Sequence, residues 1–164
     1  MLILLPPSEG KNQPISQARV NLDKLVFAKE LIAIRGRLLT KTLASAPAAK
    51  AMDVYTGVLY QALDWPSLSA SAKKRASSSV VIISAKYGAI TPDTRIETYK
   101  EKINNKAMSE KVAAVLDPIK TPLIVDCRSS TYKTVWKAPV DITVEIRVST
   151  VVDGVRTVIT HMSK

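Results

Sequence analysis

Val80-Val-Ile-Ile-Ser84 is followed by the polar segment Ala85-Lys-Tyr-Gly88, and this pairing of an apolar run with a polar end decides the fold. A continuous apolar run rich in β-branched residues is typical of a central strand that is buried on both faces. Leu2-Ile-Leu-Leu5 and Leu123-Ile-Val-Asp126 have the same form. The sequence therefore predicts three buried strands, each followed by polar residues.

Helical patterns lie between the predicted strands. Apolar residues recur with helical spacing after Asn21, a candidate N-cap, and the segment around Pro47 is rich in alanine. Asp117-Pro118 ends a third apolar pattern. We expect helices over residues 22–39, 44–52, 58–63 and 106–116, and a further one from Ser129 or Ser130 through residues 132–136.

The region after Pro139 changes to strand-like alternation. Apolar side chains occupy every second position from Ile142 to Val148, and Asp153-Gly154 precedes a second alternating run, which is the pattern of a hairpin. We therefore expect an α/β fold with a mixed, partly parallel sheet flanked by helices and a C-terminal antiparallel hairpin. We expect one domain, residues 1–164.

Composition narrows the class of protein. The 164 residues carry 24 Lys and Arg against 14 Asp and Glu, a formal net charge of +10. No apolar run approaches the roughly 20 residues that span a bilayer, and the apolar start of the chain is too short for a signal peptide. A single cysteine (Cys127) and a single histidine (His161) exclude an internal disulfide and an ordinary zinc site. We expect a cytoplasmic protein with no membrane partner, no metal site and no cofactor.

The surplus of positive charge favours an acidic partner, most often nucleic acid. The alternative is a basic surface that only keeps the protein soluble. Basic residues are spread between Arg19 and Lys50 and form the cluster Lys73-Lys74-Arg75, with no long tail of like charge. A basic surface would therefore belong to the folded chain.

The polar segments after the three strands are the strongest candidates for a site, because the carboxyl ends of parallel strands form the crevice where open α/β sheets bind ligands. Ser8-Glu-Gly-Lys11 can offer N–H groups and an ammonium to an anion, and Arg128 beside a helix start suits the same ligand. The alternative is a plain turn in which Gly10 supplies a positive φ. We expect one cleft faced by Ser8, Lys11, Tyr87 and Arg128, with Tyr60 and Asp93 at its rim.

Other side chains carry weaker signals. Cys127 near a helix start could act as a nucleophile with His161 as its base, and the alternative is a buried, inert thiol. Carboxylates near predicted loops suit a hard cation or acid–base work, or only capping and salt bridges: Glu9, Asp93, Glu97 and Asp126. Five tyrosines either line a pocket and stack on bases, or pack their rings: Tyr55, Tyr60, Tyr87, Tyr99 and Tyr132.

Taken in order, the polar segments resemble the YaaA family. The blocks that carry the resemblance are Leu4-Leu-Pro-Pro-Ser-Glu-Gly-Lys11, Tyr55-Thr-Gly-Val-Leu-Tyr60-Gln-Ala-Leu63, Ser84-Ala-Lys-Tyr-Gly88 with Pro92-Asp93 and Tyr99-Lys100, Asp126-Cys-Arg-Ser-Ser-Thr-Tyr132, and Ile159-Thr-His-Met-Ser-Lys164. Each block is weak alone, but the ordered set is specific and touches nearly the whole chain.

The resemblance implies a bacterial cytosolic protein of the peroxide-stress response, which limits free-iron-driven damage and binds double-stranded DNA. It implies a mixed α/β fold with a deep, positively charged cleft and a helix-hairpin-helix-like element, for which Arg35-Gly36-Arg37 is the nearest candidate. Family chains continue past the His-Met-Ser-Lys stretch, so this chain is expected to lack the family's C-terminal helical end.

Three functions stay open. The favoured one is non-specific binding of double-stranded DNA, with an anionic small molecule in the cleft as a further partner. The second is an enzyme acting on a nucleotide or phosphorylated small molecule, with no catalytic residue assigned, and the third is a metal-handling protein that uses carboxylates. The expected nucleic-acid or anion contacts are Ser8, Glu9, Lys11, Tyr60, Lys86, Tyr87, Asp93, Arg95, Lys100, Arg128, Ser129, Tyr132, Lys133, His161 and Lys164.

Overall fold

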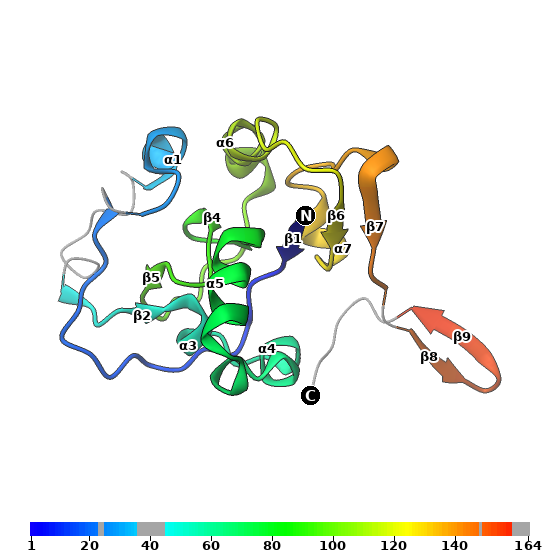
Figure 1. Cartoon of the computed structure of the whole chain (residues 1–164), viewed down its shortest axis with the longest axis horizontal. Coiled ribbons are helices and arrows are strands. Elements are labelled where there is room, and N and C mark those ends of the chain that lie inside the picture. Colours follow the sequence, from blue (N-terminus) through cyan, green and yellow to red (C-terminus); the bar gives the residue numbers. More distant parts are fainter. Residues whose placement is uncertain (23–24, 36–44, 148, 159–164) are drawn as a thin grey trace.

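A mixed five-stranded sheet forms the centre of the computed structural model, which describes residues 1–22, 25–35, 45–147 and 149–158 (Figure 1). The strand order is β4-β3-β1-β6-β7. All neighbours pair in parallel except β3 and β4, which are antiparallel. The strands are β1 (Leu2–Leu5), β3 (Val80–Ser84), β4 (Gly88–Ile90), β6 (Ile124–Asp126) and β7 (Thr143–Glu145). The three predicted buried strands and the partly parallel sheet are confirmed.

Strand β1 lies between β3 and β6 and pairs with both. Leu4 is opposite Val81 on one side and Asp126 on the other, so the three strands end at the same edge of the sheet. Successive side chains of a strand point to opposite faces. Leu4 accordingly packs in the core on one face of the sheet, and Leu5 packs in the core on the other.

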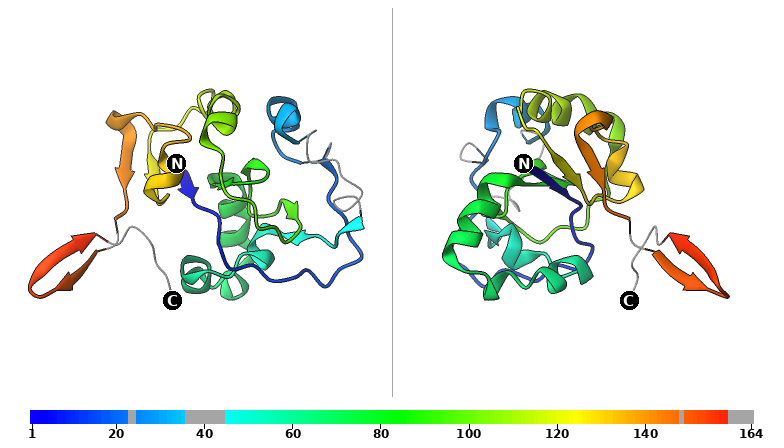
Figure 2. Two further views of the ribbon diagram at one scale, coloured as in Figure 1. Left: turned by 180° about the vertical axis from the view of Figure 1, so that it is seen from behind. Right: turned by 45° about the vertical axis from the view of Figure 1, so that its right-hand side comes forward.

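Helices cover both faces of the sheet (Figures 1 and 2). One core, around Leu5 and Ile82, lies beneath a layer of short helices and a longer one. That layer consists of α3 (Ala51–Val54), α4 (Val58–Leu63), η3 (Trp65–Ser67) and α5 (Ala70–Ser79). The other core, around Leu4 and Ile83, is covered by α1 (Ala28–Arg35) and α6 (Asn105–Leu116). No helix among the described residues is both long and apolar enough to cross a membrane.

Two of the predicted helices are confirmed almost residue for residue. Helix α4 has the predicted bounds, and the left-handed Asp64 (φ 43°) ends it before Trp65. Helix α6 starts one residue before the predicted position, and the Asn104 side chain caps it by accepting the N–H of Ala107. Helix α5 was not predicted, because none of its ten residues, all of them described, is fully buried and no apolar stripe marks it.

Three helix predictions were wrong in extent. The helix expected through residues 132–136 ends at Lys133, the last residue of α7 (Ser130–Lys133). The helix expected over residues 22–39 begins at Ala28, because Phe27 adopts a left-handed conformation (φ 57°), and residues 36–39 lie outside the described residues. In the segment 44–52, Pro47 bridges to Arg19, and Ala49–Lys50 (β2) pairs antiparallel with β5 (Arg95–Ile96). Tertiary pairing thus overrides the helix propensity of the alanines.

The predicted C-terminal hairpin is confirmed, with a different first arm. Strands β8 (Ser149–Val152) and β9 (Val155–Val158) pair through a two-residue turn in which both Asp153 (φ 51°) and Gly154 (φ 77°) are left-handed. The alternation that begins at Ile142 belongs instead to β7, which follows the short helix η4 (Val140–Ile142) and joins the main sheet. Figures 1 and 2 show the hairpin projecting away from that sheet.

Arg35 joins the first helix to the edge of the sheet from inside the protein. Its side chain is 1% exposed and donates to the carbonyl oxygens of Val26, Tyr87 and Ala89 at 2.6, 3.1 and 3.0 Å. Burial lowers the pKa of Arg35 to about 10. This contact connects α1 to the β3–β4 turn, and it makes Arg35 a structural residue rather than part of a nucleic-acid element. The rest of the proposed helix-hairpin-helix candidate, Gly36 and Arg37, lies outside the described residues.

We predict that Arg35→Met destabilises the protein by roughly 2–4 kcal/mol, because three buried carbonyl groups lose their donor. Lys29→Met, an exposed position on the same helix, is the control and should change the free energy of unfolding by less than about 0.5 kcal/mol. Urea denaturation followed by circular dichroism measures both. Equal losses in the two variants would contradict the role assigned to Arg35.

Candidate functional site at the carboxyl edge of the sheet

The loop after β1 is held against the segment between α3 and α4. The Ser8 hydroxyl accepts the N–H of Gly57 at 2.6 Å, and the carbonyl of Gly10 accepts the N–H of Thr56 at 3.0 Å. Lys11 then forms a β-bridge with Tyr55. These bonds determine the position at which Lys11 leaves the edge of the sheet.

Two glycines permit this close approach. A Cβ on Gly57 would lie 2.6 Å from the Ser8 hydroxyl oxygen, and one on Gly10 would lie 2.9 Å from the Thr56 hydroxyl oxygen. Gly10 does not have a positive φ, so the alternative of a left-handed turn there is wrong. The glycine is needed because a side chain there would meet the Thr56 hydroxyl of the facing segment.

The Lys11 ammonium lies against aromatic rings. Its Nζ is 4.2 Å from the ring centroid of Tyr99 and 5.8 Å from that of Tyr55, which are cation–π distances. Burial lowers the pKa of Lys11, although the charges of Glu101 and Glu9 partly oppose this effect. None of the ion pairs found among the described residues includes Lys11.

A chain of hydroxyl groups runs beneath Lys11. The Tyr55 and Tyr99 hydroxyls lie 2.7 Å apart, and the Tyr99 and Ser84 oxygens lie 2.8 Å apart. Ser84 also accepts the N–H groups of Lys86 and Tyr87, which fixes the turn after β3. Burial raises the pKa values of Tyr55 and Tyr99, so both phenols are neutral in the folded protein at pH 7.

Lys86, by contrast, is paired with two carboxylates. Its Nζ contacts Glu97 and lies 2.8 Å from Glu101 Oε1. Although burial acts in the opposite direction, hydrogen bonds to both carboxylates raise the pKa of Lys86. Glu97 is 6% exposed, so this pair lies largely inside the protein. Lys86 is therefore already neutralised and is a weaker anion ligand than Lys11.

Arg128 does not face the cleft, which corrects the sequence prediction. The side chain is 1% exposed and binds both carboxylate oxygens of Asp126 at 2.9 and 2.8 Å. It also donates to the carbonyls of Tyr132 and Trp136 and stacks on the Trp136 ring. The strands are parallel as predicted, so Arg128 does follow β6 at the expected edge. It turns inward because the carboxylate two residues earlier is buried and needs a partner.

Tyr87 and Asp93 were also expected at the cleft, and neither lies there. Tyr87 is fully buried, and burial raises its pKa. Asp93 binds Lys50 at 2.6 Å and also binds Ser77, which lies just before the start of β3. It lies there because β4 runs antiparallel to β3 and carries the chain back to the opposite edge of the sheet. The hydrogen bonds from Lys50 and Ser77 lower the pKa of Asp93. Arg95 is exposed in the same region, in β5.

The remaining candidates divide into three groups. The first group shares the site. Tyr60 donates a hydrogen bond to the carbonyl of Pro6 in the loop after β1. Burial raises the pKa of Tyr132 to about 12, and Tyr99 and Glu9 act in the same direction. Ser129 is the N-cap residue of the short helix α7 (Ser130–Lys133), Lys133 binds Glu145 at 3.0 Å, and Lys100 is exposed beside Tyr99. His161 and Lys164 lie outside the described residues.

The arrangement does not favour thiol or metal chemistry among the described residues. Cys127 is half-buried, and burial together with the Asp126 charge raises the pKa of its thiol, which disfavours the reactive thiolate. No group of three or more His, Cys, Asp or Glu side chains in the described part of the chain is placed to hold a metal ion.

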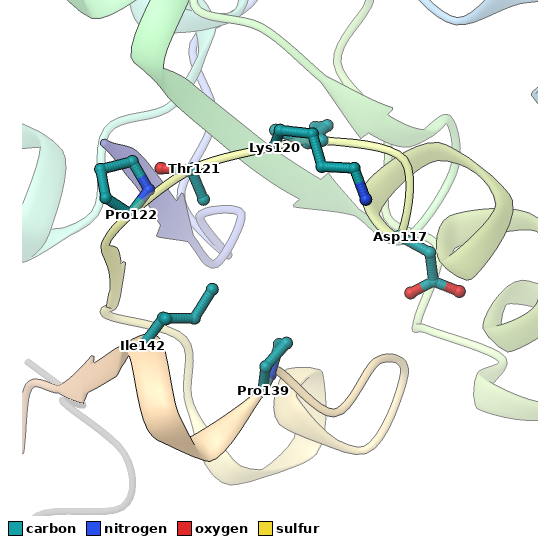
Figure 3. Close-up of a pocket in the computed structure, with 7 residues that line it drawn as sticks. Asp117, Lys120, Thr121, Pro122, Pro139 and Ile142 are labelled. Carbon is teal, nitrogen blue, oxygen red and sulfur yellow. The ribbon is translucent and has the colours of Figure 1, made fainter.

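Two surface hollows lie away from the tyrosines. One, of about 510 Å³, is bounded by Asp117, Lys120, Thr121, Pro122, Pro139 and Ile142 at the start of β6 and β7 (Figure 3). The other, of about 530 Å³, includes Arg19, Asp93 and Arg95. The residues that line these two hollows do not include Lys11 or the tyrosines, so neither hollow is part of the carboxyl-edge site.

Sequence reasoning placed Ser84 in a polar segment of the site without a role for its hydroxyl, and it missed Glu101. The segment from Glu97 to Lys102 returns to the carboxyl edge after β5, and no pattern in the sequence marks that return. The tyrosines were recognised as a group, but which of them touch Lys11 depends on this return.

Comparisons with known proteins match this chain to one family and to several relatives. The family model described as "Peroxide stress protein YaaA" matches residues 21–164. A UPF0246 protein of Streptomyces coelicolor is 30% identical over all of this chain and 78% of its own length, and one of Corynebacterium efficiens is 29% identical over all of this chain and 80% of its own. The matched spans are 204 and 208 residues long against 164 here, so both relatives contain segments that this chain lacks.

We predict that Gly57→Ala lowers the free energy of unfolding by about 2 kcal/mol, because the new methyl group collides with the Ser8 hydroxyl. Ser8→Ala removes that hydroxyl, so the double variant should lose less stability than the two single variants added together. Denaturant titration of the four proteins measures this coupling. A double variant whose loss equals the sum would show that the two residues do not meet.

We predict a pH-dependent effect of Glu101→Gln. Burial by itself raises the pKa of Glu101, but hydrogen bonds from Lys86 and the backbone outweigh it and lower the pKa. The ionised carboxylate therefore stabilises the fold above the ordinary glutamate pKa, and this contribution disappears as the pH falls through the lowered value. Glu101 is 45% exposed, so the variant should lose less than about 1 kcal/mol at pH 7, and the loss should shrink steadily as the pH is lowered below the ordinary glutamate pKa. A loss that does not shrink as the pH falls would contradict this.

Proposed function

This chain belongs to the peroxide stress protein YaaA family, and from that membership we propose that it serves the peroxide-stress response by binding double-stranded DNA. The observation that carries the proposal is the formal net charge of +10 on a folded chain of 164 residues. A surplus of this size attracts the phosphate backbone whatever the base sequence. Binding to chromosomal DNA would place the protein in the cytoplasm.

The contact surface we propose is the carboxyl edge of the sheet and the segment that leads from it into α6. Lys100 and Lys102 are exposed on either side of Glu101, and Lys106 follows in the first turn of α6. Lys11 adds a half-buried ammonium at the same edge. Buried Arg128 and paired Lys86 and Lys133 support this surface instead of contacting phosphate directly.

Such binding offers a physical route to less iron damage. Duplex DNA concentrates cations around its phosphates, and a bound cationic protein releases them. Ferrous iron displaced in this way generates hydroxyl radicals farther from the DNA. We therefore propose that the protein limits iron-driven damage by occupying the phosphate backbone.

An enzyme acting on a nucleotide or phosphorylated small molecule is the second candidate. Lys11 favours it, because a half-buried ammonium lying on aromatic rings suits a compact anion beside a planar base. This candidate predicts saturable binding of a free nucleotide with little dependence on salt, whereas duplex binding falls steeply with salt.

We predict that the protein shifts duplexes of unrelated sequence at low salt, with a log–log salt slope of about −0.9 for each phosphate contacted. Lys100→Ala combined with Lys102→Ala should reduce the magnitude of that slope by about 1.8, since two contacts are lost. The matched control removes two exposed charges from α5, Lys74→Ala with Arg75→Ala, and should leave the slope unchanged. Electrophoretic mobility shifts at several salt concentrations measure the slopes.

Absence of any duplex binding at low salt by the folded protein would overturn the proposal. Equal slopes for the edge variant and the α5 variant would leave non-specific binding in place but remove the surface assigned to it. Protection of the duplex against cleavage by ferrous iron and hydrogen peroxide should rise and fall with occupancy, and a bound duplex cleaved as fast as a free one would refute the iron effect.

A further inference from the structure

Within the part of the chain that the structure describes, no ion pair joins the Lys11 amine, at the carboxyl edge, to a carboxylate. Three other lysines do form ion pairs: Lys50 with Asp93 at 2.6 Å, Lys86 with Glu97 and Glu101, and Lys133 with Glu145 at 3.0 Å. The carboxylates nearest to Lys11 act on it only through space, and one of them, Glu101, already binds Lys86.

The surroundings of Lys11 shift its protonation equilibrium towards the neutral amine, because burial lowers its pKa. Two tyrosine rings cover part of the side chain. The charged groups that face it are Glu9, from its own loop, and Glu101, from the segment after β5; Tyr55 and Tyr99 are neutral neighbours. A desolvated lysine amine is the side chain that proteins use to attack carbonyl carbons.

The amine is also held in place. The bonds of Ser8 and Gly10 to the segment before α4 fix the backbone on the amino side of Lys11, and its bridge to Tyr55 fixes the residue itself. Buried Tyr55 and Tyr99, bound to each other and to Ser84, form a rigid floor. A nucleophile positioned on a rigid floor loses little freedom on reaction.

We propose that Lys11 forms an imine with the open-chain aldehyde of an abasic site in damaged duplex DNA. The inference rests on the proposed DNA binding, which would bring that aldehyde to the carboxyl edge. An abasic site has no base to unpair or unstack, so its sugar reaches a protein surface at little cost. Lys100 and Lys102 follow Tyr99 in the same segment and would hold the neighbouring phosphates.

The reaction is a condensation that balances without an oxidant or reductant. The Lys11 nitrogen adds to C1′ of the aldehyde to give a carbinolamine, and the C–O bond then breaks. The two amine hydrogens leave with that oxygen as one molecule of water, and a C=N bond remains. Glu9, exposed beside Lys11 and Tyr132, is placed to exchange these protons with solvent.

Reduction with cyanoborohydride tests the proposal, because it converts the imine into a permanent protein–DNA link. The full chain is mixed with an end-labelled duplex that contains one abasic site, at a protein concentration that saturates the duplex, and cross-linked product is resolved on a denaturing gel. We expect a cross-link with this duplex and none with one that carries a tetrahydrofuran abasic analogue, which has no aldehyde. Mass spectrometry of the digested product should locate the link on the peptide that contains Lys11.

Lys11→Arg keeps the charge but removes the nucleophile, and it should reduce cross-linking by at least about tenfold. The control is Lys74→Ala, an exposed lysine on α5, which should cross-link like the parent. A cross-link on Lys100 or another lysine, or an undiminished yield with Lys11→Arg, would overturn the inference. Should Lys11→Arg fail to fold, the peptide map of the parent protein still decides.

Two further arms separate this inference from the proposed function. If the protein binds intact duplex but gives no cross-link with abasic duplex, the imine is refuted and the proposed DNA binding still stands. Without any DNA, glycolaldehyde and cyanoborohydride should modify Lys11 faster than Lys74 if the amine is activated. Equal rates at the two lysines would mean that Lys11 only packs on the tyrosines, and the inference would fail regardless of DNA binding.

Discussion

Parallel pairing of β1 with β3 on one side and β6 on the other is the constraint on which the rest of the structure depends. Parallel strands must end at a common edge, so the polar segments that follow them are brought together although about 40 to 120 residues separate them along the chain. β1 has only four residues, and its third residue, Leu4, is fully buried. A register shift of one residue would reverse which side chains face each core and would displace every loop at the edge.

From this edge, each loop reaches its position by a different kind of contact. The loop after β1 depends on glycines that allow two backbones to touch, and the turn after β3 depends on the Ser84 hydroxyl. The loop after β6 depends on the buried Asp126–Arg128 pair, whose guanidinium also binds the carbonyls of Tyr132 and Trp136. Such a pair contributes to the geometry of the loop more than to net stability, because desolvation offsets much of its attraction.

The sequence predicts the strands, their partly parallel pairing, the hairpin turn and two helices, because each depends on local periodicity or on one turn residue. It does not predict the inward turn of Arg128, since the same Asp-x-Arg spacing is compatible with an exposed cation. It places Asp93 at the wrong edge because the direction of β4 is not visible in three residues. The helix expected near Pro47 fails for a similar reason: pairing of Ala49–Lys50 with β5 is a long-range contact.

The distribution of carboxylates explains why the edge is chemically asymmetric. Glu97 and Glu101 approach from the segment after β5, and both reach Lys86. Asp126 forms an ion pair with Arg128. The cations that follow β3 and β6 are therefore both neutralised within the protein. The loop after β1 differs, because packing against residues 54–57 directs Lys11 onto the faces of tyrosine rings. The first strand thus ends at a cation that takes part in none of the ion pairs found among the described residues, and the rings keep its amine partly dry.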